Sequence, residues 1–194
     1  MTIDYSDGAT PFSQDEMDDL LLTHITTRGE LDRWELENIN EAYQWAERLK
    51  HRNILNENFL CLLHKRMFGN VWKWAGTFRK SEKNIGISWV EIAVYLKLLC
   101  DDANTWLGFD TYPPDEFAAR FHHRLVYIHP FANGNGRHAR LMADLILEKL
   151  FKTEPFTWGG AVLTKQGVSR AAYIKALKAA DNHDYSLLLQ FVRS

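Results

Sequence analysis

The sequence has little of several features that define particular protein classes. Cys61 and Cys100 are the only cysteines among its 194 residues, and they lack the close spacing of a zinc or redox pair. We therefore expect two buried free thiols in a reducing compartment. No apolar run is long enough to span a bilayer, and the N-terminus lacks the basic-then-apolar order of a signal peptide. These absences predict a cytoplasmic protein.

An excess of positive charge is also missing. The formal net charge is −2, and no basic patch is evident, so we expect neither direct nucleic-acid binding nor attachment to an anionic membrane. Hydrophobic residues make up 46% of the chain and aromatic residues 13%, which excludes a disordered protein. The length fits one globular domain.

Hydrophobic periodicity predicts a mostly α-helical fold. We expect a flexible N-terminal arm over residues 1–14, N-terminal helices over 15–50 and a core over 51–194. A short acidic helix is expected over 15–22. Apolar residues recur at helical spacing in four further segments: 29–49, 58–68, 91–106 and the helix that starts at Pro114. After residue 140 we expect a continuation of one helix, followed by one or two further helices. Residues 71–90 break the pattern and predict a small β-hairpin, with Trp72 and Trp74 in the core.

The most informative segment is the twelve residues His129-Pro-Phe-Ala-Asn-Gly-Asn-Gly-Arg-His-Ala-Arg140. Glycine lets backbone N–H groups approach an anion closely, so we expect unusual dihedral angles at Gly134 and Gly136. Good helix formers follow, which places the turn at a helix N-terminus, where phosphate is favoured. Arg137 and Arg140 are three apart and can face one side of that helix.

His129 is the residue in this segment that can accept a proton near neutral pH. It is expected at the C-terminal end of a helix, where the macrodipole favours the protonated imidazole, whereas the nearby arginines oppose it. The sequence leaves this competition open.

The segment resembles the signature of Fic proteins, His-Pro-Phe-x-Asp/Glu-Gly-Asn-Gly-Arg-x-x-Arg. The resemblance implies a Fic-type helical bundle that transfers AMP from ATP to a hydroxyl of a target protein, with Mg²⁺ as cofactor. It further implies His129 as general base, an anion hole at Gly134, Asn135 and Gly136, and phosphate contacts from Arg137 and Arg140. Phe131 would be a buried packing anchor.

Asn133 departs from the signature, which has a carboxylate at this position. The family role of this position is to hold Mg²⁺. An amide oxygen remains a ligand for this hard cation but lacks the negative charge, so we expect a weakened metal site.

Two further segments have family counterparts. The hairpin residues Asn84, Ile85, Gly86 and Ile87 correspond to a flap that pairs with the target's backbone like an added strand. An ordinary structural hairpin is the alternative. Near the N-terminus, Thr26 and Glu30 resemble an inhibitory motif whose glutamate pairs with the second arginine, here Arg140. The same two residue types at a helix start also fit simple capping.

Resemblance to the bacterial Fic branch called mobile mystery protein B covers most of the chain, and it implies a helix-turn-helix partner protein. It rests on three segments: 72–76, 121–124 and 176–181.

Other functions stay open. The same phosphate cradle could serve phosphotransfer or transfer of another nucleotide, and the chain could be a non-catalytic, toxin–antitoxin-like nucleotide-binding module. The histidines around the motif do not have zinc-ligand spacing, and we expect His138 to face solvent or the outer side of the motif.

Overall fold

The computed structural model describes residues 17–50, 53–160 and 166–194. The expected arm over residues 1–14 lies outside these ranges. Of the acidic helix expected over 15–22, the described part is helical only at residues 17 and 18, and Leu20 then forms an isolated antiparallel bridge with Trp72.

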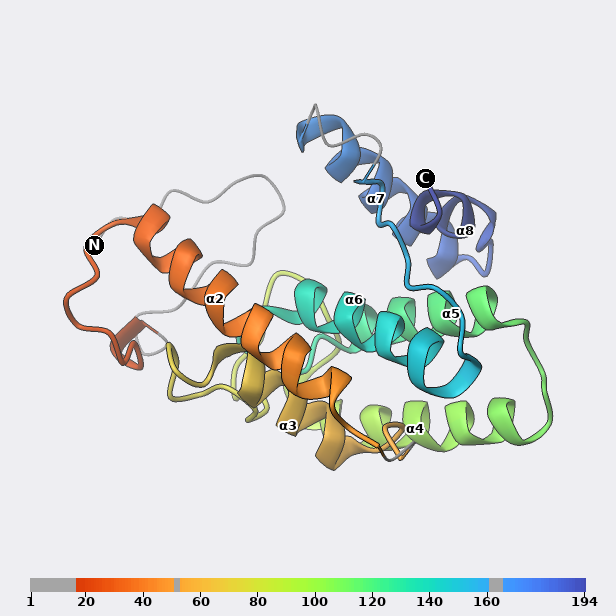
Figure 1. The fold of residues 1–194 in the computed structure, drawn as a ribbon, viewed down its shortest axis with the longest axis horizontal. Coiled ribbons are helices and arrows are strands. Elements are labelled where there is room, and N and C mark those ends of the chain that lie inside the picture. Colours follow the sequence, from red (N-terminus) through yellow and green to blue (C-terminus); the bar gives the residue numbers. More distant parts are fainter. Residues whose placement is uncertain (1–16, 51–52, 161–165) are drawn as a thin grey trace.

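The described chain is built from helices, as expected (Figure 1). Helix α2 packs on α3, α5 packs on both α4 and α6, and α7 packs on α8. No helix of the described residues is long and apolar enough to cross a membrane. The bounds are α2 Arg28–Glu47, α3 Glu57–Phe68, η1 Trp89–Glu91, α4 Ile92–Gly108, α5 Pro114–Ile128, α6 Asn135–Ile146, η2 Leu147–Phe151, α7 Gln166–Asp181 and α8 Ser186–Val192.

Helix α5 positions the start of the motif. It begins with Pro114, whose missing N–H costs nothing in a first turn. Its apolar face is buried, with Phe117 and Phe121 fully inaccessible. The helix ends where His129 adopts a left-handed conformation, with φ 52° and ψ 59°. Burial of one face therefore fixes where the helix delivers His129.

The core confirms the expected positions of the two tryptophans. Trp72 is fully buried and Trp74 nearly so, and their rings stack with centroids 5.1 Å apart. Cys100 is buried and Cys61 half-buried, and both are free thiols.

The prediction of a β-hairpin over residues 71–90 is wrong. This segment contains turns and bends and no strand, and its one β contact is the bridge from Trp72 to Leu20. A side chain takes the place of a strand ladder: the guanidinium of Arg79 donates to the carbonyls of Ser81 and Ile87. Because these carbonyls are already bonded, the segment closes as a loop without cross-strand pairing.

Candidate active site

His129 lies at the junction of α5 and the motif loop. The Nε of Arg79 donates to the His129 carbonyl at 2.8 Å, and the Arg79 backbone N–H donates to the Pro130 carbonyl at 2.9 Å. Burial first, and the Arg79 charge second, lower the pKa of His129 to about 4. The imidazole is therefore neutral at pH 7 and able to accept a proton, mainly because it is buried.

The motif loop is closed by its own asparagine. The Asn135 side chain accepts from the Phe131 N–H and donates to the Phe131 carbonyl, both at 2.9 Å. Phe131 is fully buried, which confirms its expected role as packing anchor. Its ring stacks on His64 with centroids 3.7 Å apart.

His64 on α3 is a positioning residue that the sequence did not reveal. Its Nδ1 accepts from the Gly76 N–H at 3.0 Å, so its Nε2 carries the proton and donates to the Asn133 carbonyl at 3.0 Å. Complete burial holds the pKa of His64 well below its ordinary value, which keeps this tautomer neutral. One side chain thus connects the motif loop to the loop after α3.

The two motif glycines differ, which corrects the expectation that both need unusual dihedral angles. Gly134 has a φ of 76°, and a Cβ there would lie 2.6 Å from the ring of Phe68. Gly136 lies inside α6 without a positive φ, and a Cβ there would meet nothing within 4 Å. Only Gly134 is needed for the turn, whereas Gly136 borders open space at the helix N-terminus. The first N–H groups of a helix have no partner within it, so this space suits an anion.

Arg137 points to a buried carboxylate. Its Nη1 donates to Glu35 Oε2 at 2.6 Å, and Glu35 is only 2% exposed. The other oxygen of Glu35 accepts from the Trp72 indole N–H at 2.7 Å. The Arg137 guanidinium also lies over the Phe68 ring, 4.8 Å from its centroid. A carboxylate of α2 therefore holds the first motif arginine, a pair that no local sequence pattern predicts.

Arg140 lies close to two aromatic rings. Its Cζ is 4.8 Å from the ring centroid of Tyr173 and 5.8 Å from that of Trp158. Its Nε is buried without a hydrogen-bond partner among the described residues. The structure thus brings both arginines to α6 but gives them different neighbours.

Asn133 has the chemistry of a weak Mg²⁺ ligand. Its Oδ1 accepts from the Gly134 N–H at 2.7 Å. Within the described part of the chain, no three His, Cys, Asp or Glu side chains are grouped so that they could hold a metal ion. The amide oxygen fits a hard cation, but phosphate oxygens or water must supply most of the coordination.

The proposed flap lies against His129. Asn84, Ile85 and Gly86 are exposed and Ile87 is half-buried. Gly86 has a φ of 99°, and a Cβ there would lie 2.6 Å from the Cβ of His129. The absence of a side chain at Gly86 therefore allows this loop to approach the candidate base.

Thr26 and Glu30 lie at the start of α2. The Glu30 carboxylate accepts from the backbone N–H groups of Thr26 and Thr27, each at 3.1 Å, and Thr27 in turn caps the Glu30 N–H. This is the capping arrangement that the sequence left open, with Thr27 as the N-cap. The carboxylate shown on a motif arginine is that of Glu35, and it binds Arg137.

The other histidines have structural partners. His122 bonds with the Tyr173 hydroxyl at 2.9 Å, and His123 with Asp181 at 2.8 Å. The expectation that His138 faces solvent or the outer side of the motif is wrong: it is fully buried and donates to the Leu60 carbonyl at 3.0 Å. It is buried because α6 packs this side against α3.

A cavity of about 540 Å³ extends from the end of α5 toward the connection between α7 and α8. It does not include the motif arginines, and its own basic groups are engaged. Arg120 pairs with Glu116 and Arg124 with Asp102, each at 2.7 Å. The cavity is lined by Tyr95, Trp106, Tyr112, Arg120, His123, Arg124, Tyr127, Ile128, Ala180, Asp181, His183 and Tyr185.

Comparison with known proteins identifies the domain that carries this site. Residues 54–147, which include the whole motif, match the model of the Fic/DOC family. This part of the chain is similar to Fic/DOC proteins. A protein adenylyltransferase Fic from Aedes aegypti is 27% identical over 87% of the chain, and one from Drosophila melanogaster is 31% identical over 67%. The chain spans only 34% and 26% of the lengths of these two relatives.

Solved Fic structures share the fold. Fic-1 (residues 134–508) from C. elegans has a TM-score of 0.69 at 23% identity, over 93% of this chain and 54% of its own. BepC from Bartonella tribocorum, solved with bound AMPPNP, has a TM-score of 0.68 at 18% identity, over 93% of this chain and 97% of its own. At these identities the likeness establishes a Fic-like helical fold.

Proposed function

We propose that this Fic domain transfers AMP from Mg-ATP to a hydroxyl group of a target protein. The main support for the proposal is the position of His129. This neutral imidazole lies at one end of the motif loop, and the other end of the loop leads into the N-terminus of α6, which has no side-chain cap. A proton acceptor and an anion site thus lie in one turn of the chain. The AMPPNP bound to BepC and the names of the insect relatives support a nucleotide as the ligand.

Each motif residue has a role in this proposal. His129 removes the proton from the target hydroxyl as its oxygen attacks the α-phosphorus of ATP, and pyrophosphate leaves. The N–H groups at Asn135 and Gly136 bind phosphate oxygens. Arg137 binds the diphosphate and Arg140 the γ-phosphate, because planar guanidinium groups donate paired hydrogen bonds.

Mg²⁺ would be held by Asn133 together with the phosphates. When bound, the ion neutralises part of the phosphate charge. The protein itself would contribute one neutral ligand, the Asn133 amide oxygen, so we expect Mg²⁺ to bind weakly.

The target would be presented by the flap over Asn84, Ile85, Gly86 and Ile87. Three of these residues are exposed, and the loop lies against His129. Exposed backbone at this position can pair with an extended target segment and bring a Ser, Thr or Tyr hydroxyl to the imidazole. A cytoplasmic location and a helix-turn-helix partner of the kind implied by the mobile mystery protein B branch also belong to this proposal.

We also propose that the enzyme is restrained by a carboxylate of its N-terminal helix. In the described conformation Glu35 holds Arg137, so a nucleotide diphosphate must compete for the guanidinium. Inhibition through Glu30 and Arg140 would require the capping box at Thr26 and Thr27 to open first.

The decisive experiment compares ATP labelled on the α-phosphate with ATP labelled on the γ-phosphate, in a cell lysate with purified protein. Transfer of the α-label identifies adenylylation, whereas transfer of the γ-label identifies the rival phosphotransferase. His129→Ala should lower the rate about 10²- to 10⁴-fold, as expected for loss of a general base. His183→Asn at an exposed position is the matched control. Nucleotide binding without transfer of either label would favour a non-catalytic module.

A further inference from the structure

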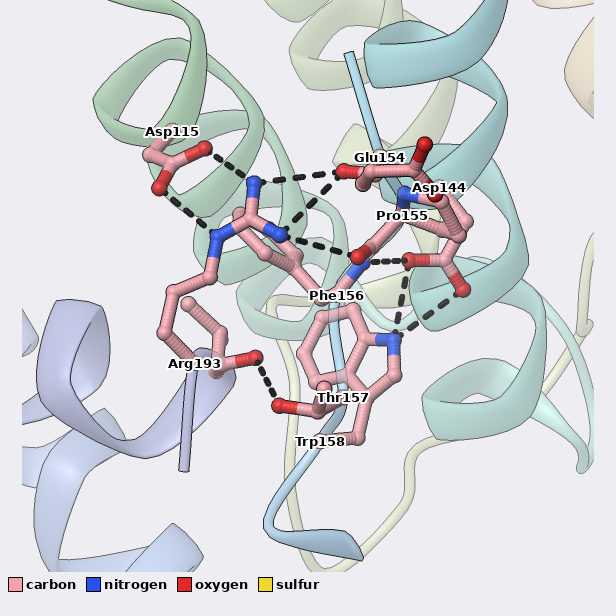
Figure 2. A network of polar contacts seen from close by, with 9 residues as sticks. Asp115, Asp144, Glu154, Pro155, Phe156, Thr157, Trp158 and Arg193 are labelled. Carbon is pink, nitrogen blue, oxygen red and sulfur yellow. Dashed lines mark hydrogen bonds and ion pairs between the residues drawn. The ribbon is translucent and has the colours of Figure 1, made fainter.

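Trp158 stands over the second motif arginine from a loop outside the motif. This loop, residues 154–158, follows η2, and Arg193 links it to Asp115 near the start of α5 (Figure 2). Trp158 itself has a φ of 53°, a left-handed conformation that a bulky side chain rarely adopts. Backbone strain of this kind persists only where surrounding contacts impose it.

Several contacts fix the loop. The backbone N–H groups of Thr157 and Trp158 donate to the Val192 carbonyl at 2.9 and 3.2 Å. Arg193 donates to the Glu154 and Pro155 carbonyls and pairs with Asp115 (Figure 2). The C-terminal end of the chain thus holds the backbone on both sides of Phe156.

The indole of Trp158 is anchored to the helix that carries Arg140. Its Nε1–H is 3.0 Å from each carboxylate oxygen of Asp144, one turn after Arg140 on α6 (Figure 2). The same carboxylate accepts from the Phe156 N–H at 3.1 Å. Burial raises the pKa of Asp144 to about 6, still below neutrality, so the group remains an ionised acceptor at pH 7.5.

This anchoring places an aromatic face beside the Arg140 guanidinium. The Tyr173 ring is also close to this guanidinium, and both rings attract the cation. The Arg140 side chain also hydrogen-bonds the Tyr173 side chain, whereas its buried Nε has no hydrogen-bond partner among the described residues. The Trp158 ring also contacts the rings of His122 and Phe156, with centroids 4.7 and 5.2 Å apart.

We propose that Trp158, anchored by Asp144, is a positioning residue that holds Arg140 for the terminal phosphate and so favours triphosphate over monophosphate nucleotides. The inference rests on the proposed function, in which Arg140 binds the γ-phosphate. It assigns a specificity role to a residue that lies 18 positions after the motif arginine and outside the segment 54–147 matched by the family model.

The test is calorimetric titration of the purified chain with Mg-AMPPNP and with AMP. Trp158→Ala should weaken AMPPNP binding about 3- to 30-fold, the range expected for loss of a cation–π contact, and leave AMP binding unchanged. Arg140→Ala should weaken AMPPNP binding at least as much, and adding Trp158→Ala to it should cause no further loss. Trp45→Phe is the control, because Trp45 on α2 stacks on Phe59 of α3 and not on a motif arginine.

Three milder variants show whether a loss of affinity reflects misfolding. Trp158→Phe keeps the ring and loses the bond to Asp144, so a smaller loss of AMPPNP affinity is expected. Asp144→Asn keeps an acceptor and should preserve affinity, whereas Asp144→Leu should behave like Trp158→Phe.

Equal weakening of AMPPNP and AMP, or additive losses in the double variant, would overturn the positioning role. If Arg140→Ala weakens AMPPNP binding and the Trp158 variants do not, only the inference about Trp158 fails. If the wild-type chain binds neither nucleotide, the proposed function fails with it.

Discussion

Gly86 and His129 approach each other so closely that a Cβ on Gly86 would lie 2.6 Å from the Cβ of His129. The flap and the candidate base therefore form one packed unit, although 42 residues separate them in the sequence. Their contact means that the flap cannot change without moving the imidazole.

Gly86→Ala should accordingly impair transfer. The new methyl group meets His129, and the φ of 99° is unfavourable for alanine, so the loop must shift. We expect at least a tenfold lower rate of labelled AMP transfer with nucleotide affinity retained. Gly108→Ala is the control, because a Cβ there meets nothing within 4 Å. Equal rates for wild type and Gly86→Ala would contradict the arrangement of flap and base.

Glu35→Gln should increase nucleotide affinity. The variant removes the charge that holds Arg137 and keeps an oxygen that can accept from the Trp72 indole. A net charge-assisted bond of about 1.5 kcal/mol corresponds to roughly tenfold tighter ATP binding, measured by calorimetry.

Glu30→Gln distinguishes the two restraints. Since the Glu30 carboxylate caps α2, we expect this variant to lower the melting temperature slightly and to leave ATP affinity unchanged. If it raises affinity and Glu35→Gln does not, the restraint is located at Glu30, as the sequence motif implies.

Asn133→Asp should lower the Mg²⁺ concentration needed for half-maximal transfer. The substitution restores the carboxylate of the family signature and adds a charge to an oxygen already placed in the motif loop. The requirement is measured by titrating Mg²⁺ at fixed ATP. An unchanged or raised requirement would count against a metal role for this position.

Acid should destabilise the fold through its buried histidines. The pKa values of His122 and His138 are lowered to about 3 and that of His129 to about 4, in each case mainly by burial. Below the unfolded value of about 6.5 the unfolded chain binds more protons, so stability falls by about 1.4 kcal/mol per histidine per pH unit. The pKa of Asp144 is raised to about 6, so this carboxyl binds its proton at a higher pH in the folded chain than in the unfolded chain. Its protonation therefore stabilises the fold and offsets the loss of stability from one histidine.

Urea denaturation at pH 7.5, 6.5 and 5.5 measures this effect. The free energy of unfolding should drop between pH 6.5 and 5.5, and it should drop less in a His138→Gln variant, which cannot be protonated. A free energy that stays constant over this range would show that these imidazoles are not held neutral.

The sequence predicted the helices well because their apolar spacing reports a single buried face. Pro114 marked the start of α5, and the periodicity ended at His129, where the structure ends the helix. The hairpin was mispredicted because alternating apolar residues and glycines suggest strands, whereas the buried guanidinium of Arg79 bonds the carbonyls that a strand ladder would have used.

The candidate site was only half predictable. The motif gave the base, the turn and the arginines, but the partners of these groups lie far away in the chain. Arg137 meets Glu35 across 102 positions, and the Asn133 carbonyl meets His64 across 69. Glu35 and His64 each lie on an amphipathic helix, and the residues around them in the sequence do not indicate these distant contacts.

By itself the sequence determined the order of helices and the chemistry available in one twelve-residue loop, because these depend on local backbone preference and residue type. Only the tertiary structure decided which carboxylate holds Arg137, which rings flank Arg140 and why His129 is neutral. These are properties of burial and of contacts between distant segments, and both exist only after the helices have packed.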